Sequence, residues 1–176
     1  MEATKLIPNY SYKDYLNWEG RWELIEGIPF AMSPMASPRH QLIANKLGRL
    51  FDESLESANC NCQVYQPIDV KIKDNTVVNP DILIVCEEIK GQYLDKPFPL
   101  VVEILSPSTR IKDQVTKYSL YEEFGIKYYI IVDPENNSVQ VYVLNKEGKY
   151  QKQKKYIFRI KDECKIEVDF QEALKT

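Results

Sequence analysis

The sequence predicts a mixed α/β (α+β) fold in which helices cover a central β-sheet. Two amphipathic helical patterns alternate with strand patterns along the chain. The strand patterns at 82–86, 100–105 and 127–134 are apolar on both faces, and a sheet buried on both faces is covered by helices. The chain has 176 residues, of which 44% are hydrophobic. This length favours a single domain over residues 1–176 with its own core.

Composition narrows the class of protein. No apolar run approaches the roughly 18 residues that a membrane span requires, and the first twenty residues lack the apolar core of a signal peptide. We therefore expect a soluble, cytoplasmic protein without membrane contacts. The net charge of −3 argues mildly against an obligate nucleic-acid coat protein. Four cysteines without a histidine cluster make no zinc motif, and we expect them to be free thiols.

The N-terminal third contains two helical patterns separated by a hairpin. A short helix is expected to begin near Ser11 or Tyr12, and residues 21–34 predict two short strands around Glu26-Gly27. Ser37-Pro38 is a typical N-cap and first helical position, and the helix is expected to end near Ser57. One face of that helix is apolar and begins with His40, Ala44, Leu47 and Phe51.

The rest of the chain alternates strands with one further helix. Residues 62–72 predict a half-buried strand with Gln66 as the polar residue on its apolar side, and Pro67 suggests an edge or bulge. A helix is expected from about Thr109 to Phe124, with Gly125 just beyond its end. The remaining expected elements are a turn at 73–75, strands at 77–86, 100–105 and 127–134, an antiparallel pair at 135–144 and 149–160, and a short strand or turn leading into a last helical turn at 166–175.

Lysines gather near the C-terminus. They are Lys146, Lys149, Lys152, Lys154, Lys155 and Lys161, together with Arg159. We favour a solvated hairpin in which lysines protect an edge strand from pairing with other chains. The alternative is a surface that contacts phosphates of a nucleic acid.

Glu103 is the first candidate for a functional residue. In the strand 100–105, Leu100, Val102 and Ile104 share one face, while Glu103 lies between Val101 and Leu105 on the other. Both faces are apolar, so either orientation of the strand buries the carboxylate. An unpaired buried charge costs several kcal/mol, so this carboxylate needs a partner.

Lys117 is the expected partner. On a helical wheel it lies close to Asp113, Leu120 and Phe124, and the apolar members of that set define the side that packs on the sheet. A lysine on this buried face needs a carboxylate. The simplest interpretation is a structural ion pair of Lys117 with Glu103 or Asp81, without any active site.

A functional interpretation adds Asp81, which stands in "NPD" at the entrance to an apolar strand. Alone, this aspartate is typical of a turn. Together with Glu103, however, it could hold Mg²⁺ or Mn²⁺, because these cations prefer oxygen ligands. Such a metal activates water and stabilises charge on phosphoryl oxygens, and Lys117 could orient the nucleophile.

These residues resemble the PD-(D/E)XK nuclease superfamily, and most of the chain is similar to the Uma-two family of restriction-endonuclease-like proteins. The segments that carry the resemblance are "WELIEGIPFAMSP", "SPRHQLIANKL", "NPDILIV", "VVEILSPST", "KDQVTKYSLYEEFGIKYYIIVDP" and "VQVYVL". The resemblance implies a restriction-endonuclease-like fold, a mixed sheet flanked by helices. It also implies that Asp81 and Glu103 are the ligands of Mg²⁺ or Mn²⁺ and that Lys117 is the catalytic lysine.

The resemblance has further implications. Glu23 and Gln66 match family positions that face the site, whereas His40 fits a catalytic or a core histidine equally well. The simple superfamily pattern has lysine two residues after the acid, where this chain has Leu105. The implied function is a metal-dependent endonuclease acting on DNA, and a homodimer is compatible with it by analogy. The alternative is an inactive nucleic-acid- or protein-binding module on the same fold.

Overall fold

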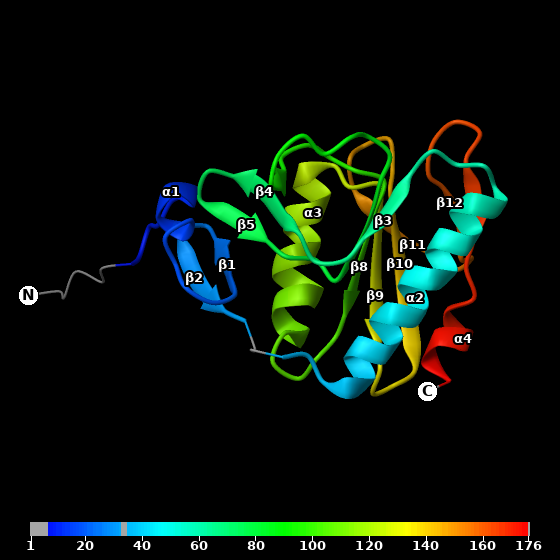
Figure 1. The fold of residues 1–176 in the computed structure, drawn as a ribbon, viewed down its shortest axis with the longest axis horizontal. Helices are drawn as coiled ribbons and strands as arrows, with labels where there is room; N and C mark the ends of the chain where they lie inside the picture. Colours follow the sequence, from blue (N-terminus) through cyan, green and yellow to red (C-terminus); the bar gives the residue numbers. More distant parts are fainter. Residues whose placement is uncertain (1–6, 33–34, 176) are drawn as a thin grey trace, which may run out of the picture.

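The computed structural model describes residues 7–32 and 35–175, which form a mixed α+β fold around a six-stranded sheet (Figure 1). The strand order of this sheet is β11-β10-β9-β8-β6-β3. Its two central strands, β8 and β9, run parallel, and the other pairs are antiparallel. The strands are β3 (Gln63–Tyr65), β6 (Ile82–Val85), β8 (Leu100–Ile104), β9 (Tyr128–Asp133), β10 (Ser138–Leu144) and β11 (Tyr150–Gln153).

Helices cover both faces of this sheet, as the doubly apolar strands predict. Helix α2 (Pro38–Ser57) packs its buried residues against one face, where Ile82, Ile84 and Val102 point. Helix α3 (Tyr118–Phe124) packs against the other face, where Val101 lies. No helix in the described ranges is long and apolar enough to cross a membrane.

A second sheet lies beyond α3, so that α3 is enclosed between two sheets (Figure 1). Its order is β2-β1-β5-β4-β7. The short helix α1 (Tyr12–Tyr15) precedes it. Its strands are β1 (Trp22–Ile25), β2 (Ile28–Ala31), β4 (Asp69–Lys73), β5 (Thr76–Val78) and β7 (Tyr93–Leu94).

Two strands that the sequence predicts as continuous are divided between the sheets, so those predictions are wrong in extent. The strand expected at 62–72 becomes β3 and β4, and the break contains Pro67. The strand expected at 77–86 becomes β5 and β6, and the break contains Pro80. Proline lacks the N–H that a sheet ladder needs, and at both positions the chain passes from one sheet to the other.

The C-terminal region follows the prediction in part. Strands β10 and β11 form the expected antiparallel pair, and β11 lies at the sheet edge with Lys152 exposed beside it. The predicted strand at 149–160 is interrupted, however, because β12 (Ile157–Arg159) pairs separately with β13 (Lys165–Glu167). The chain ends with α4 (Phe170–Leu174), as the expected last helical turn.

The expectation of free cysteines is wrong. Cys60 and Cys164 form one disulfide, and Cys62 and Cys86 form another. The second pair follows from the strand register, since Gln63 lies opposite Val85 and the adjacent cysteines therefore face each other. The first pair connects the end of α2 to the β12–β13 hairpin across 104 residues, a separation over which sequence alone predicts no pairing.

Candidate active site

Strand register brings Asp81 and Glu103 together at one end of the six-stranded sheet. Ile82 pairs with Val102 in the β6–β8 ladder, so the residues just beyond them lie across from each other. Asp81 Oδ2 accepts a hydrogen bond of 2.8 Å from the backbone N–H of Ile104. Two carboxylates from separate strands therefore lie at the same sheet end, as the metal-site hypothesis requires.

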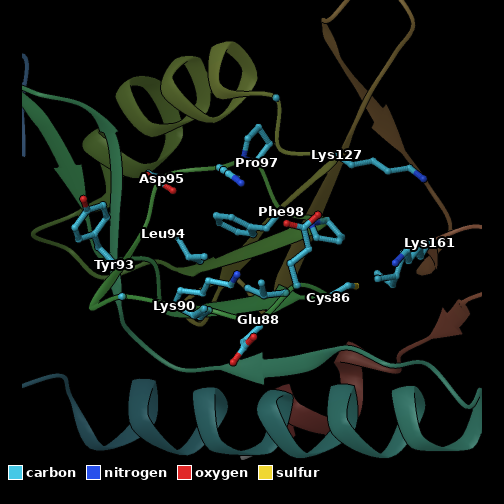
Figure 2. Close-up of a pocket in the computed structure, with 18 residues that line it drawn as sticks. Cys86, Glu88, Lys90, Tyr93, Leu94, Asp95, Pro97, Phe98, Lys127 and Lys161 are labelled. Atoms are coloured by element: carbon cyan, nitrogen blue, oxygen red, sulfur yellow. The ribbon is translucent and has the colours of Figure 1, made fainter.

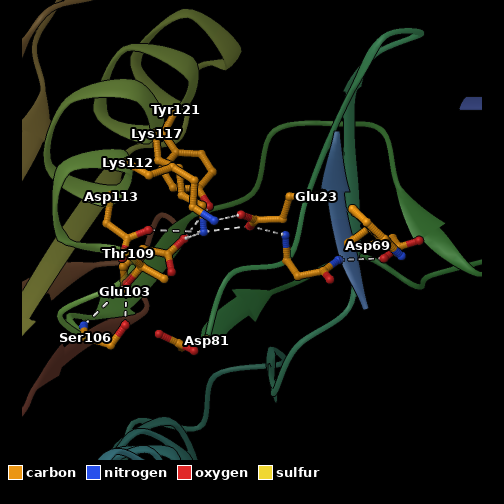
Figure 3. Close-up of polar contacts among 12 residues, drawn as sticks. Glu23, Asp69, Asp81, Glu103, Ser106, Thr109, Lys112, Asp113, Lys117 and Tyr121 are labelled. Carbon is orange, nitrogen blue, oxygen red and sulfur yellow. Dashed lines mark hydrogen bonds and ion pairs between the residues drawn. The ribbon is translucent and has the colours of Figure 1, made fainter. Parts of the chain in front are cut away.

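Lys117 is buried between the two sheets and contacts three carboxylates (Figure 3). Its Nζ lies 2.8 Å from Glu103 Oε1, 2.8 Å from Glu23 Oε1 and 3.4 Å from Asp113 Oδ1. Glu23 comes from β1 of the small sheet and Glu103 from β8 of the large sheet. The sequence predicts the pair with Glu103, and the structure adds that the same ammonium joins the two sheets.

Lys112 is a second lysine at this site, and the sequence pattern does not indicate it. Its ammonium forms an ion pair with Glu23 Oε2. An α-helix places residues five apart about 140° from each other around the axis, which excludes Lys112 from the face of Lys117. The segment η1 (Lys112–Lys117) is instead a π-helix. Its i→i+5 pattern brings both lysines to Glu23, and such turns often occur at functional sites.

Glu23 is fully buried yet ionised. Burial would raise the pKa of its carboxyl, but the charges of Lys117 and Lys112 outweigh that effect and lower the pKa to about 2. Glu23 Oε1 also accepts the backbone N–H of Asn79 at 3.0 Å. Its negative charge is therefore matched by two cations and does not depend on either one alone.

The remaining acids are less well compensated. Burial raises the pKa of Glu103 well above its usual range, and the charge of Lys117 only partly offsets it. Burial likewise raises the pKa of Asp113. Burial alone would lower the pKa of Lys117, but Glu103, Glu23 and Asp113 outweigh it and raise that pKa. Burial is thus the main cause of the raised pKa of the two acids, whereas the neighbouring carboxylates cause the raised pKa of Lys117.

Several carboxylate oxygens have no hydrogen-bond partner within the described ranges. Asp113 Oδ1 is buried and unpaired in this sense, although Lys117 lies at ion-pair distance. Asp81 and Glu103 each use one oxygen, Oδ2 and Oε1 respectively, in the contacts found there. Carboxylate oxygens of this kind are suitable ligands for a hard cation such as Mg²⁺. Across residues 7–32 and 35–175, however, no three His, Cys, Asp or Glu side chains are arranged as a preformed metal site.

Tyr121 and His40 contact the two predicted ligands. The Tyr121 hydroxyl donates a 2.6 Å hydrogen bond to Glu103 Oε1 and is fully buried. His40, at the start of α2, has its Nε2 3.2 Å from Asp81 Oδ2. Burial would lower the pKa of His40, but its hydrogen bond to Asp81 and the charge of that residue outweigh burial and raise it. His40 is therefore a neighbour of the candidate site and not a purely apolar core residue.

Gln66 lies elsewhere. It is exposed, and its amide nitrogen is 3.7 Å from the position that a Cβ on Gly48 of α2 would occupy. Gly48 lies in the middle of α2, two turns beyond His40. The structure therefore brings Glu23 to the predicted cluster, whereas Gln66 has no contact with the cluster within the described ranges. Gln66 is polar because its side chain lies beside α2 and is exposed to solvent.

A cavity of about 820 Å³ lies at the opposite end of the same strands (Figure 2). Its walls come from residues 85–91 and 93–99, Gly125, Lys127 and the Ile160–Lys161 segment. Pro99 and Lys127 immediately precede β8 and β9, whereas Glu103 lies near the far end of β8. None of the residues predicted for the active site lines this cavity, so cavity and carboxylate cluster are separate features.

Comparisons with known proteins agree with this fold. The model of the Uma2 family, described as "Putative restriction endonuclease", matches residues 12–171. A protein of Synechocystis named "Uncharacterized protein slr1290" is 30% identical over 153 residues, which cover 81% of this chain and 78% of that protein. The crystal structure of a protein from Anabaena variabilis, described as "a putative nuclease belonging to DUF820", superimposes with a TM-score of 0.75 at 15% identity. That superposition covers 94% of this chain and 99% of the other, and shows a common fold.

Proposed function

The chain belongs to the Uma2 family of restriction-endonuclease-like proteins, and from this premise we propose that it is an endonuclease that uses Mg²⁺ or Mn²⁺ to hydrolyse phosphodiester bonds of DNA. The observation that carries the proposal is the set of acids gathered at one end of the sheet. Asp81 lies across from Glu103 there, and Lys117 contacts Glu103, Glu23 and Asp113. A divalent cation would offset the negative charge of these carboxylates when they are ionised.

Asp81 and Glu103 are the proposed ligands, because each has one oxygen outside the hydrogen bonds found in the described ranges. Mg²⁺ commonly takes one or two carboxylates and completes its shell with waters, so a site without a third protein ligand is consistent with the cluster. When bound, the metal would lower the pKa of a coordinated water and stabilise charge on a phosphoryl oxygen.

The protein groups around these ligands have separate roles in the proposal. Lys117 and Tyr121 both donate to Glu103 Oε1 and fix its orientation. Lys117 also supplies positive charge beside the carboxylates, where it can orient an attacking water. His40 holds Asp81 Oδ2 from the α2 side. Partners of this kind are worth about 10- to 100-fold in metal affinity or activity.

The test is cleavage of plasmid and oligonucleotide DNA with Mg²⁺ or Mn²⁺. We expect Asp81→Ala to lower the rate by more than about 100-fold, since a direct ligand should matter more than its outer partners. Asp95→Ala removes an exposed aspartate at the opposite end of the sheet and should retain activity. Cleavage that survives Asp81→Ala would refute this site. A folded wild type that binds DNA without cleaving it would instead favour the binding-module alternative.

A further inference from the structure

The two lysines of the cluster differ in access to solvent. The side chain of Lys117 is 3% exposed, and its three donors face three carboxylates. The side chain of Lys112 is 16% exposed and, among residues 7–32 and 35–175, has one carboxylate partner. Lys117 could reach an incoming anion only by leaving several buried charges unpaired, which is costly. Lys112 is the lysine that a substrate can approach.

Moving Lys112 away from Glu23 would not leave that carboxylate alone. Glu23 Oε1 would still contact Lys117 at 2.8 Å and accept the Asn79 N–H at 3.0 Å. Lys117 thus remains as the cation that pairs with Glu23. Lys112 can therefore leave the Glu23 carboxylate and bind another anion instead. A phosphate oxygen carries the charge and acceptor geometry that this exchange requires.

An aromatic ring lies beside the Lys112 ammonium. Phe30 on β2 pairs with Glu23 on β1, and paired residues project from the same face of a sheet. The Phe30 ring centroid is 5.9 Å from Lys112 Nζ, and the residue is 38% exposed. Exposed aromatic rings in proteins that bind single strands serve as surfaces on which nucleic-acid bases stack.

We propose that Lys112 and Phe30 together bind one unpaired nucleotide, with its phosphate on the ammonium and its base against the ring. The inference rests on the proposed function for the nature of the polymer and adds the class of substrate: single-stranded nucleic acid, or a duplex with an unpaired nucleotide at the site. A base within an intact duplex is stacked on its neighbours and cannot occupy the Phe30 face. Duplex DNA would therefore use Lys112 alone.

The test measures binding by fluorescence anisotropy, with Ca²⁺ in place of Mg²⁺ and oligonucleotide integrity checked afterwards. Single-stranded and duplex oligonucleotides of the same sequence are compared across salt concentrations. The proteins are wild type, Lys112→Gln, Lys112→Arg, Phe30→Ala and Phe30→Tyr. Lys13→Gln removes an exposed lysine on α1 and is the matched charge control. Thermal unfolding verifies that each variant is folded.

The expected results separate the two contacts. Lys112→Gln should weaken single-strand binding and reduce its salt slope by about 0.7, the value for one phosphate contact, whereas Lys112→Arg and Lys13→Gln should keep the wild-type slope. Phe30→Ala should weaken single-strand binding by about fivefold or more with little effect on duplex, since stacking on one ring contributes about 1–3 kcal/mol. Phe30→Tyr should restore binding.

The results that overturn the inference differ from those that overturn the proposed function. The inference fails if wild type does not bind single strands or does not prefer them, if Lys112→Gln keeps the wild-type salt slope, or if Phe30→Ala leaves single-strand binding unchanged. Metal-dependent cleavage that requires Asp81 would still support the proposed function in those cases. Conversely, the expected binding pattern without any cleavage would support the nucleotide site and refute hydrolysis.

Discussion

Glu103 is an acidic residue that is almost fully buried, with 2% of its surface exposed. Two donors compensate its burial, the Lys117 ammonium at 2.8 Å and the Tyr121 hydroxyl at 2.6 Å, and both reach Oε1. Breaking a buried pair by removing one partner costs about 3–5 kcal/mol. The residue is therefore held by the same contacts that leave its other oxygen for a ligand.

Tyr121 provides a test of this arrangement at the level of one hydroxyl. We expect Tyr121→Phe to lower the free energy of unfolding by about 0.5–1.5 kcal/mol, the usual net contribution of one hydrogen bond, since Lys117 still pairs with the same oxygen. Tyr118→Phe is the matched control, since Tyr118 is partly exposed and its hydroxyl has no hydrogen bond in the described ranges. Urea denaturation measures both. Equal stability losses would contradict the role of Tyr121.

Individual residues of the site were predictable where their local pattern was regular. Glu103 stands out because its strand is apolar on both faces, and Lys117 because α-helical geometry places it with Leu120. The helical wheel does not place Lys112 at the site, because it assumes 100° per residue, whereas η1 is a π-helix with a different angle per residue. The contact of Glu23 with both lysines joins residues about 90 positions apart, which no local pattern encodes.

Among the secondary-structure elements, the π-helix η1 resembles an α-helix into which one additional residue has been inserted. The Tyr129 hydroxyl donates a 2.6 Å hydrogen bond to the carbonyl oxygen of Asp113 and supports the irregular backbone. Downstream, α3 is regular and ends at Gly125, whose positive φ of 89° suits a helix C-terminus. The irregularity is thus confined to the turn that carries the lysines.

Deleting one residue within η1 should regularise the helix. In a Gln114 deletion, Lys112 and Lys117 become four apart, a spacing that places them on one face of an α-helix. We expect this variant to keep its ion pairs and to change the free energy of unfolding by less than about 1 kcal/mol. Deleting Ser119 within α3 should rotate Lys117 by about 100° and cost at least about 3 kcal/mol. Urea denaturation of both variants is the measurement, and equal costs would contradict this account.

The boundaries of helices and strands were predictable where capping residues, proline or glycine mark them. Ser37-Pro38 correctly marks the start of α2, and Gly125 marks the end of α3. Pro67 predicts an edge or a bulge. The edge is confirmed, because β3 is the last strand of its sheet, and beyond it the chain passes to the other sheet at Pro67 without a bulge there. An alternating pattern indicates that a segment is a strand. It does not indicate which of two sheets the strand joins, because both sheets offer a buried face to its apolar side chains.

For the whole molecule, the two sheets meet across a layer that contains both apolar packing and buried charge. The apolar part includes Ile25, Val78, Val101 and Leu120. The charged part holds Glu23 and Glu103 on opposite sides of Lys117. The mixed fold was predictable from doubly buried strands, whereas this layer was not, since the N-terminal hairpin gives no sign that it covers a helix.

The two buried acids with raised pKa values predict how stability depends on pH and metal. Because burial raises the pKa of Glu103 and Asp113, these two carboxyls hold more protons in the folded state than in the unfolded chain above about pH 4. The free energy of unfolding should therefore fall as pH rises through those raised pKa values. Mg²⁺ or Mn²⁺ should restore it, by about 2.7 kcal/mol at one hundred times Kd.

Thermal unfolding from about pH 5 to pH 8, with and without metal, measures this dependence. The increase in Tm caused by metal should grow with pH, since metal and protons compete for the same carboxylates. Asp81→Ala should lose most of the increase, and Asp95→Ala should keep it. A Tm that is identical with and without metal at every pH would favour a purely structural ion pair.

The Cys60–Cys164 disulfide also changes the covalent connectivity of the chain. It closes a covalent ring of residues 60–164 with two tails, one of which carries Glu23. Asp81, Glu103, Lys112, Asp113 and Lys117 all lie within the ring. A protease that cuts the exposed Lys90-Gly91 bond would thus open the ring without separating the molecule into two pieces. The oxidised chain should run as one species in denaturing electrophoresis after such a cut, and as two only when thiols are added.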